Sequence, residues 1–176
     1  MKKIMMTLVA IAMATTMNAQ WYVGGTVGYQ YQNNKNTDVT TNTFKILPEV
    51  GYNLNEDWAV GVKIGYAYTK EGDAKLNEFV VNPYVRYTFV KLDKVNFFVD
   101  GGVEYDYLKA GDASANGFGI NVKPGVAVNL NEKVSFVAHI GNLGWSTAKW
   151  KNAESVNNVN VGLDLAAVDF GLYFNF

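Results

Sequence analysis

Few side chains in this sequence are able to do covalent or metal chemistry. There is no cysteine and a single histidine, His139, which excludes a disulfide framework, a thiolate zinc site, a cysteine nucleophile and a multi-histidine metal site. His139 and the alternate carboxylates Glu104 and Asp106 remain as candidates for general acid–base chemistry. A histidine base needs a nucleophile to activate, and the serines nearest to it along the chain are Ser135 and Ser146.

Charge and glycine spacing narrow the range of partners. The 176 residues include 15 Lys and Arg against 16 Asp and Glu, a formal net charge of −1. Because there is no basic surplus, we expect no nucleic-acid partner. Glycines such as Gly24, Gly25 and Gly28 precede no helical pattern, so they do not form a phosphate-binding loop, and we expect no cofactor.

The elements that carry the candidate residues alternate with a period of two, which is typical of a β-strand whose faces meet different surroundings. Between Trp58 and Thr69 every second residue is apolar or aromatic, and the residues between them are small, polar or charged. The same alternation runs through residues 79–90 and 96–107. It places Glu104 and Asp106 on one strand face, opposite the face that carries Val103 and Tyr105.

Such strands suit either a soluble sandwich or lipocalin-like barrel with its apolar face inward, or a membrane barrel with that face outward. Three features favour the membrane barrel. Aromatic residues gather at the ends of the apolar face, the opposite face mixes glycine with charge, and the segments are about 10–14 residues long, where soluble strands typically have ~5–6. We therefore predict that the apolar side chains face lipid.

Turn signals divide the chain into eight strands in up-and-down order. The expected strands are 21–31, 43–53, 58–69, 78–90, 96–108, 117–129, 134–145 and a last one that ends at Phe176 and begins near Leu165 or earlier. The connections 32–42, 70–77, 109–116 and 146–164 are longer and polar, and the others are tight. This pattern predicts an all-β, eight-stranded antiparallel up-and-down transmembrane β-barrel with both mature termini on the periplasmic side.

A repeated motif falls in the second, fourth and sixth expected strands. Pro48, Pro83 and Pro124 each begin the pattern Pro-x-Val-x-(Tyr/Val), which marks a β-hairpin repeat. Proline cannot donate a hydrogen bond to the ladder, so we expect a bulge or an unpaired position at each of these sites.

The N-terminus has the composition of a secretory signal peptide. Lys2 and Lys3 precede an apolar run over residues 4–13 that is too short to cross a bilayer as a helix, and small and polar residues follow. We expect residues 1–20 to be the signal peptide, with cleavage after Ala19 or Gln20, and residues 21–176 to be the barrel domain.

The chain ends on alternating apolar residues. Together with the signal peptide, the eight strands and the Pro-x-Val-x-Tyr repeat, this terminal strand resembles the small outer-membrane β-barrel family, akin to the outer membrane protein A and X barrels. The resemblance implies a cell outer-membrane location in a diderm bacterium, surrounding lipid, and recognition by the barrel-assembly machinery during biogenesis. The assembly signal would comprise Phe170, Leu172, Phe174 and Phe176.

The strand parity also predicts what fills the barrel. Eight strands close just wide enough for side chains to fill the interior, and inward positions carry both signs of charge. We expect an interior charge network, paired because an isolated buried charge is costly, made of Lys45, Glu49, Lys63, Arg86, Asp100, Glu104, Lys123, His139 and Asp169. The lumen would then be plugged, and the protein would have a structural, envelope-integrity or surface-interaction role without being an enzyme.

Two alternatives remain open: a narrow channel, and a lipid-modifying outer-membrane enzyme that uses His139. An offset of 76 residues aligns His139 with Lys63, which favours an interior polar role for the histidine. In addition, the residue two positions after His139 is not the serine found in outer-membrane deacylases. Any host or surface ligand would bind through the polar loops 32–42 and 146–164, since binding functions concentrate on loops held by rigid scaffolds.

Overall fold

The computed structural model describes residues 20–34, 39–72, 74–150, 155–162 and 168–176. The predicted signal peptide lies outside these residues, apart from Gln20. The described residues form ten strands. They are β1 (Trp21–Asn34), β2 (Val39–Asn53), β3 (Trp58–Glu71), β4 (Ala74–Lys91), β5 (Val95–Ala110), β6 (Ala113–Asn129), β7 (Val134–Ile140), β8 (Asn142–Trp150), β9 (Ser155–Gly162) and β10 (Val168–Asn175). No helix among them is long and apolar enough to cross a membrane.

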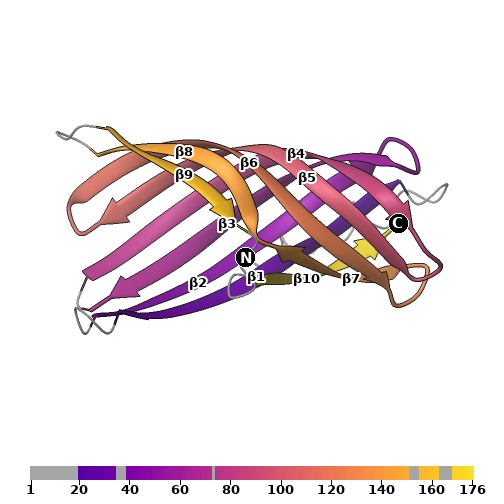
Figure 1. The fold of residues 1–176 in the computed structure, drawn as a ribbon, viewed down its shortest axis with the longest axis horizontal. Helices are drawn as coiled ribbons and strands as arrows, with labels where there is room; N and C mark the ends of the chain where they lie inside the picture. Colours follow the sequence, from indigo (N-terminus) through magenta and orange to yellow (C-terminus); the bar gives the residue numbers. More distant parts are fainter. Residues whose placement is uncertain (1–19, 35–38, 73, 151–154, 163–167) are drawn as a thin grey trace, which may run out of the picture.

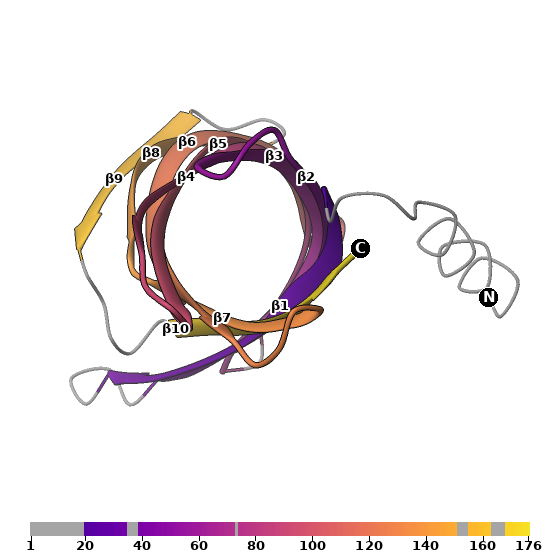
Figure 2. The same cartoon turned by 90° about the vertical axis from the view of Figure 1, so that its right-hand side faces the viewer.

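The ten strands make an eight-stranded antiparallel barrel, as predicted. β7 and β8 are two parts of one barrel strand, since both pair with β6, and they meet at Gly141, whose φ is 78°. β9 pairs with β8, and β10 pairs with β7 and with β1. Pairing of β1 with β10 and of β5 with β6 closes the sheet, and the view along the barrel shows a ring (Figure 2).

The apolar face of the sheet points outward. Trp58, Ile64 and Tyr66 are 43–45% exposed, whereas Ala59 and Lys63, on the opposite face of the same strand, are 4% exposed. This inverts the arrangement of a water-soluble β-protein, and closure of the sheet satisfies the backbone groups that hydrocarbon cannot. The predicted outward orientation of the aromatic and aliphatic residues is therefore confirmed.

Aromatic pairs reinforce the end of the barrel that carries the tight turns. The ring centroids of Trp21 and Tyr52, which are directly paired on β1 and β2, lie 5.0 Å apart. Those of Trp58 and Tyr87, paired on β3 and β4, lie 4.6 Å apart. Such a girdle is typical of the level at which a membrane barrel meets the lipid headgroups.

At the tight turns the strands end within one residue of the prediction. They run further than predicted at the opposite end, which carries the longer connections and which we call the hairpin end (Figure 1). β2 and β6 end at Asn53 and Asn129 as expected, but β1 continues to Asn34 and β6 begins at Ala113. The expectation that residues 32–42, 70–77, 109–116 and 146–164 are mainly loops is therefore wrong. The loss of apolar alternation marks the edge of the membrane, whereas hydrogen-bonded pairing continues into water with polar residues on both faces.

The last hairpin departs most from expectation. Residues 146–164 were predicted to be a loop, but β8 and β9 occupy most of this segment. The described side chains of β9, residues 155–159, are all exposed, and Figure 2 shows β9 outside the ring. The hairpin of β8 and β9 therefore leans away from the barrel axis, and residues 155–159 are exposed on both faces of β9.

Each repeated proline interrupts the ladder on one side. Pro48 and Pro83 are paired with β1 and β3, but on their other sides the described pairing stops and resumes without a change of register. Opposite Pro124 the ladder resumes one residue out of register, across Gly141. The predicted unpaired position therefore occurs at all three prolines, because none has an N–H to donate, and a shift of register accompanies it only at Pro124.

Candidate functional site

Four buried charges meet in the middle of the barrel. We call Glu49, Lys63, Arg86 and Asp100 the charge quartet; they come from β2, β3, β4 and β5, and all four are at most 7% exposed. Two acids and two bases give the quartet no net charge. A buried ion pair is tolerable only when hydrogen bonds satisfy its remaining groups, so the contacts of each member matter.

Asp100 is the centre of the quartet. Its Oδ1 accepts a hydrogen bond from Arg86 Nε at 2.6 Å, and its Oδ2 accepts one from Arg86 Nη2 at 2.8 Å, which makes a two-point clamp. Lys63 Nζ lies 3.1 Å from Oδ2, and His139 Nε2 lies 2.8 Å from the same oxygen. Donors from three other strands thus converge on one carboxylate.

Glu49 is held by tyrosines as well as by cations. Tyr173 donates a hydrogen bond to its Oε2 at 2.8 Å, and Tyr84 donates one to its Oε1. Lys63 Nζ is 3.9 Å from Oε2 and Arg86 Nη2 is 3.7 Å from Oε1. Hydroxyl donors therefore complete the shell of the one acid in the quartet that lacks a close cation.

At the level of the quartet, glycines on one strand lie against large aromatic rings of the neighbouring strand. A Cβ added to Gly51 would overlap the ring of Tyr22, one added to Gly61 would overlap the ring of Tyr84, and one added to Gly125 would overlap the ring of Phe98. The Arg86 guanidinium lies 4.0 Å from the centroid of the Phe98 ring, within cation–π range. Glycine on one strand thus allows a large ring from its neighbour to fill the lumen.

Nearer the hairpins the predicted charges form separate pairs. Lys45 Nζ lies 2.7 Å from Asp169 Oδ1, and Lys123 Nζ lies 3.3 Å from Glu104 Oε2. The structure thus brings all nine predicted interior residues into the lumen: Glu49, Lys63, Arg86, Asp100 and His139 in one cluster, and Lys45, Asp169, Glu104 and Lys123 in two pairs. Asp106 lies on the hairpin side of the quartet as well, and its buried Oδ1 has no partner among the described residues.

His139 is part of the cluster around Asp100. Besides its contact with Asp100, its Nε2 lies 3.3 Å from Lys63 Nζ, and its ring meets Phe98 edge-on at 5.3 Å. The hydroxyl of Ser135 is directed elsewhere: it donates to Asn129 at 2.9 Å and accepts from Asn175 at 3.3 Å. Within the described part of the chain, no serine hydroxyl hydrogen-bonds with the histidine.

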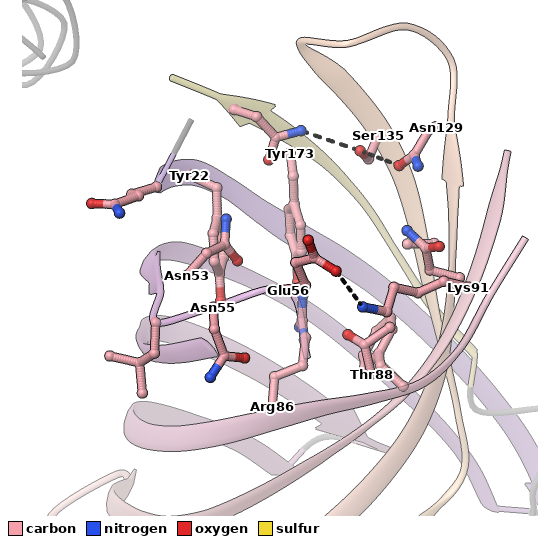
Figure 3. Close-up of a pocket in the computed structure, with 16 residues that line it drawn as sticks. Tyr22, Asn53, Asn55, Glu56, Arg86, Thr88, Lys91, Asn129, Ser135 and Tyr173 are labelled. Carbon is pink, nitrogen blue, oxygen red and sulfur yellow. Dashed lines mark hydrogen bonds and ion pairs between the residues drawn. The ribbon is translucent and has the colours of Figure 1, made fainter. Parts of the chain in front are cut away.

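A cavity of about 470 Å³ lies between the charge quartet and the tight turns. We call it the turn-end cavity. Figure 3 shows its lining: Tyr22, Arg86 and Tyr173 lie among uncharged polar side chains, and the charged residues Glu56 and Lys91 are also present. At its rim Lys91 Nζ lies 2.6 Å from Asp57 and 3.5 Å from Glu56. The quartet and its rings therefore form the floor of the turn-end cavity.

Sequence reasoning missed the aromatic members of the central layer. Tyr22, Tyr84, Phe98 and Tyr173 are 1–4% exposed and surround the quartet. The parity of their positions was a usable signal, because Tyr84 and Phe98 lie on the same strand faces as Arg86 and Asp100. The sequence analysis singled out only the charged residues and the histidine at inward positions, so these rings were not part of the expected network.

Comparisons with known proteins agree with this architecture. The model of the family described as "Outer membrane protein beta-barrel domain" matches residues 4–170. The structure is similar to Neisserial surface protein A (TM-score 0.57, 13% identity, 90% of this chain and 98% of that chain covered). It is also similar to the outer membrane protein OprG from Pseudomonas aeruginosa (TM-score 0.56, 13% identity, coverage 91% and 97%).

The N-terminal β-barrel domain of Pseudomonas aeruginosa OprF is a third similar structure (TM-score 0.52, 13% identity, coverage 91% and 100%). A comparison with curated protein sequences gave no significant match. At these identities the similar structures establish the shared fold and nothing further about activity.

Proposed function

Because this chain belongs to the outer membrane protein beta-barrel domain family and is an outer-membrane protein, we propose that it is a plugged structural scaffold of the envelope, and neither a pore nor an enzyme. One observation carries the proposal: the charge quartet and its aromatic neighbours lie across the middle of the lumen and are almost inaccessible to water. A solute crossing the barrel would have to break this set of contacts.

The energetics favour a permanent plug. Removing one partner of a buried ion pair typically costs about 3–5 kcal/mol, because the other charge is left unpaired. In this protein each acid contacts both bases, Asp100 at 2.6–3.1 Å and Glu49 at 3.7–3.9 Å. Opening a path would disturb several of these contacts at once, so spontaneous opening is rare in this proposal.

We further propose that surface contact, if the protein makes any, is made by the hairpins. Strands β3 to β6 have 14–18 residues; at a rise of ~3.3 Å per residue and a tilt of ~40°, a strand of this length spans about 40 Å, against an apolar band ~25 Å tall. The excess lies at the polar hairpin end. In this proposal the hairpins, including segments 32–42 and 146–164, face outside, and both mature termini face the periplasm.

The proposal also concerns how the barrel is assembled. The side chains of Phe170, Leu172 and Phe174 are 46–48% exposed on β10, which closes the sheet against β1. In this proposal the alternate residues that end at Phe176 are read by the barrel-assembly machinery before closure, and afterwards they face lipid.

Planar-bilayer recording tests the plug. The wild-type protein is expected to give no large, stable unitary steps, because the quartet blocks the lumen. The matched control Lys45→Ala removes a charge outside the quartet and should behave in the same way. Large stable steps from the wild-type protein would contradict the proposal and support the narrow channel.

Lipid analysis tests the enzyme alternative. Mass spectrometry of lipid A from cells that express wild-type protein or His139→Ala should show the same acylation pattern, since His139 supports Asp100 in this proposal. An acyl modification that depends on His139 would overturn the scaffold assignment in favour of a lipid-modifying enzyme.

A further inference from the structure

The wall of the turn-end cavity is a ring of uncharged hydrogen-bonding side chains. They project from the turn-side ends of most barrel strands, at the inward positions, and none carries a charge. The ring comprises Asn53 on β2, Thr88 on β4, Asn96 on β5, Asn129 on β6, Ser135 on β7 and Asn175 on β10. Carboxamide groups both donate and accept hydrogen bonds, so the ring can bind either donor or acceptor groups of a ligand.

One part of the ring is fixed and another has free hydrogen-bonding capacity. Ser135 bonds to Asn129 and Asn175 at 2.9 and 3.3 Å, which holds three side chains in place. Asn96 and Thr88 also line the cavity, but their side chains make no hydrogen bond with any residue in the described part of the chain. A wall that is held in place beside unpaired polar groups is suited to receive a polar ligand.

The floor adds one directed donor, held among aromatic rings. Tyr22 and Tyr173 stack with their ring centroids 5.3 Å apart. Arg86 is 7% exposed and lines the cavity; its Nε and Nη2 are bonded to Asp100 and Tyr173, which leaves Nη1 without a partner among the described residues. The floor therefore offers an N–H donor next to aromatic rings.

Both cations at the cavity, Arg86 and Lys91, are already paired with acids. The positive charge of Arg86 is matched by Asp100 and Glu49 inside the quartet. At the rim, Lys91 is bound to Asp57 at 2.6 Å and to Glu56 at 3.5 Å. An anionic ligand would find no free cation here, and the ring of side chains around the cavity is uncharged, so the site favours a neutral ligand with many hydrogen-bonding groups.

We propose that the turn-end cavity binds a neutral amino sugar, with several hydroxyl groups and an acetamido group. The Asn96 amide and the Thr88 hydroxyl would bond to the sugar hydroxyls, and Arg86 Nη1 would donate to the acetamido oxygen. The volume of about 470 Å³ lies within the range of roughly 300–1,000 Å³ common for small-molecule sites. The inference uses the plug as a floor and does not depend on any surface role.

A binding measurement on the folded barrel in lipid nanodiscs tests the inference. The probe is the β-1,4-linked dimer of N-acetylglucosamine, titrated by calorimetry. We expect saturable one-to-one binding by wild-type protein and at least tenfold weaker binding by Asn96→Ala. The matched control is Asn116→Ala, which removes a carboxamide bound to Tyr105 at the hairpin end of the barrel and should leave binding unchanged.

Thr88→Val provides a second variant, nearly equal in size and without the hydroxyl, should Asn96→Ala not fold. The inference is overturned if wild-type protein does not bind the probe, if both cavity variants bind as tightly as wild type, or if a small neutral peptide amide binds more tightly than the sugar. Conductance steps in the planar bilayer would overturn the proposed plug. The calorimetric result would still decide, independently, whether the cavity binds the sugar.

Discussion

The centre of the lumen and its hairpin end hold the same kinds of charged residue in different settings. In the quartet the side chains are 0–9% exposed and each acid contacts two bases. Nearer the hairpins, Lys45 and Asp169 are 33% and 14% exposed and form one pair, as do Lys123 and Glu104 at 16% and 26%. The difference shows that the number of partners rises as access to water falls, as the cost of burying a charge requires.

The turn end of the lumen differs from both of these regions because its inward residues are mostly uncharged. Its inward positions carry amides and hydroxyls and form the cavity described above. The same barrel strands therefore change the chemistry of their inward face along the axis, from neutral groups at the turns, through a paired cluster, to charged groups near the hairpins. The predictions below change one side of this comparison at a time, with stability measured by denaturant unfolding in lipid vesicles.

The largest effect is expected at the centre. Asp100→Asn preserves shape but leaves Lys63 and Arg86 opposite Glu49 alone, so the free energy of unfolding should fall by about 3–5 kcal/mol. Asp112→Asn, at an exposed hairpin turn, is the matched control and should change it by less than about 0.5 kcal/mol. If both variants unfold at the wild-type denaturant concentration, the quartet does not stabilise the barrel.

A smaller loss is expected when a hydroxyl of the central layer is removed. Tyr173→Phe deletes the hydrogen bonds to Glu49 and Arg86, and bonds to charged groups typically contribute about 1.5–3 kcal/mol. Tyr66→Phe removes a hydroxyl that bonds to Asn77 at an exposed position, and should cost less than half as much. Equal losses in the two variants would mean that burial does not strengthen the central bonds.

Packing in the central layer is tested at glycine. Gly61→Ala places a Cβ into the ring of Tyr84, and overpacking of this kind costs about 1–3 kcal/mol. Gly101→Ala, where an added Cβ would have no atom within 4 Å, should be neutral or slightly stabilising, because glycine weakens a strand. Gly61→Ala would refute the packing argument if it were as stable as Gly101→Ala.

The smallest effect is expected at the hairpin end. Lys45→Ala breaks the pair with Asp169, but partial exposure screens it, so the loss should be no more than about 1 kcal/mol. It should also shrink as salt is added, since ions screen exposed charges more than buried ones. A loss as large as that of Asp100→Asn would erase the distinction between the two regions.

The tight turns and the hairpins also differ in how far they could be predicted. The strand ends at Asn53, Trp58, Asn129 and Val134 match expectation because short turn motifs lie directly beside the membrane edge. At the first three hairpins the expected ends were two to four residues short of the observed ones, and at the last hairpin the difference was larger. Polar residues there are compatible with either a loop or a continued ladder, so the sequence pattern did not distinguish the two. The pairing of β8 with β9 had no apolar pattern to signal it.

For the site, the sequence predicted which residues belong to the interior, but it did not predict which of them contact each other. Parity alone assigned Lys63, Asp100 and His139 to one interior. It did not reveal that all three meet, nor that Tyr173 reaches Glu49 from a position 124 residues away. The turn-end cavity was not predicted, because amides at strand ends are equally common in ordinary turns.

The sequence by itself determined which face of each strand meets lipid, how many strands cross the membrane and which charges share the interior. These follow from a period of two, which is a local property of the backbone. Only the tertiary structure decided which acid binds which base, where tyrosines replace ions and where space remains. Those choices depend on how far neighbouring strands are offset when the sheet closes, and closure joins residues that no local pattern relates.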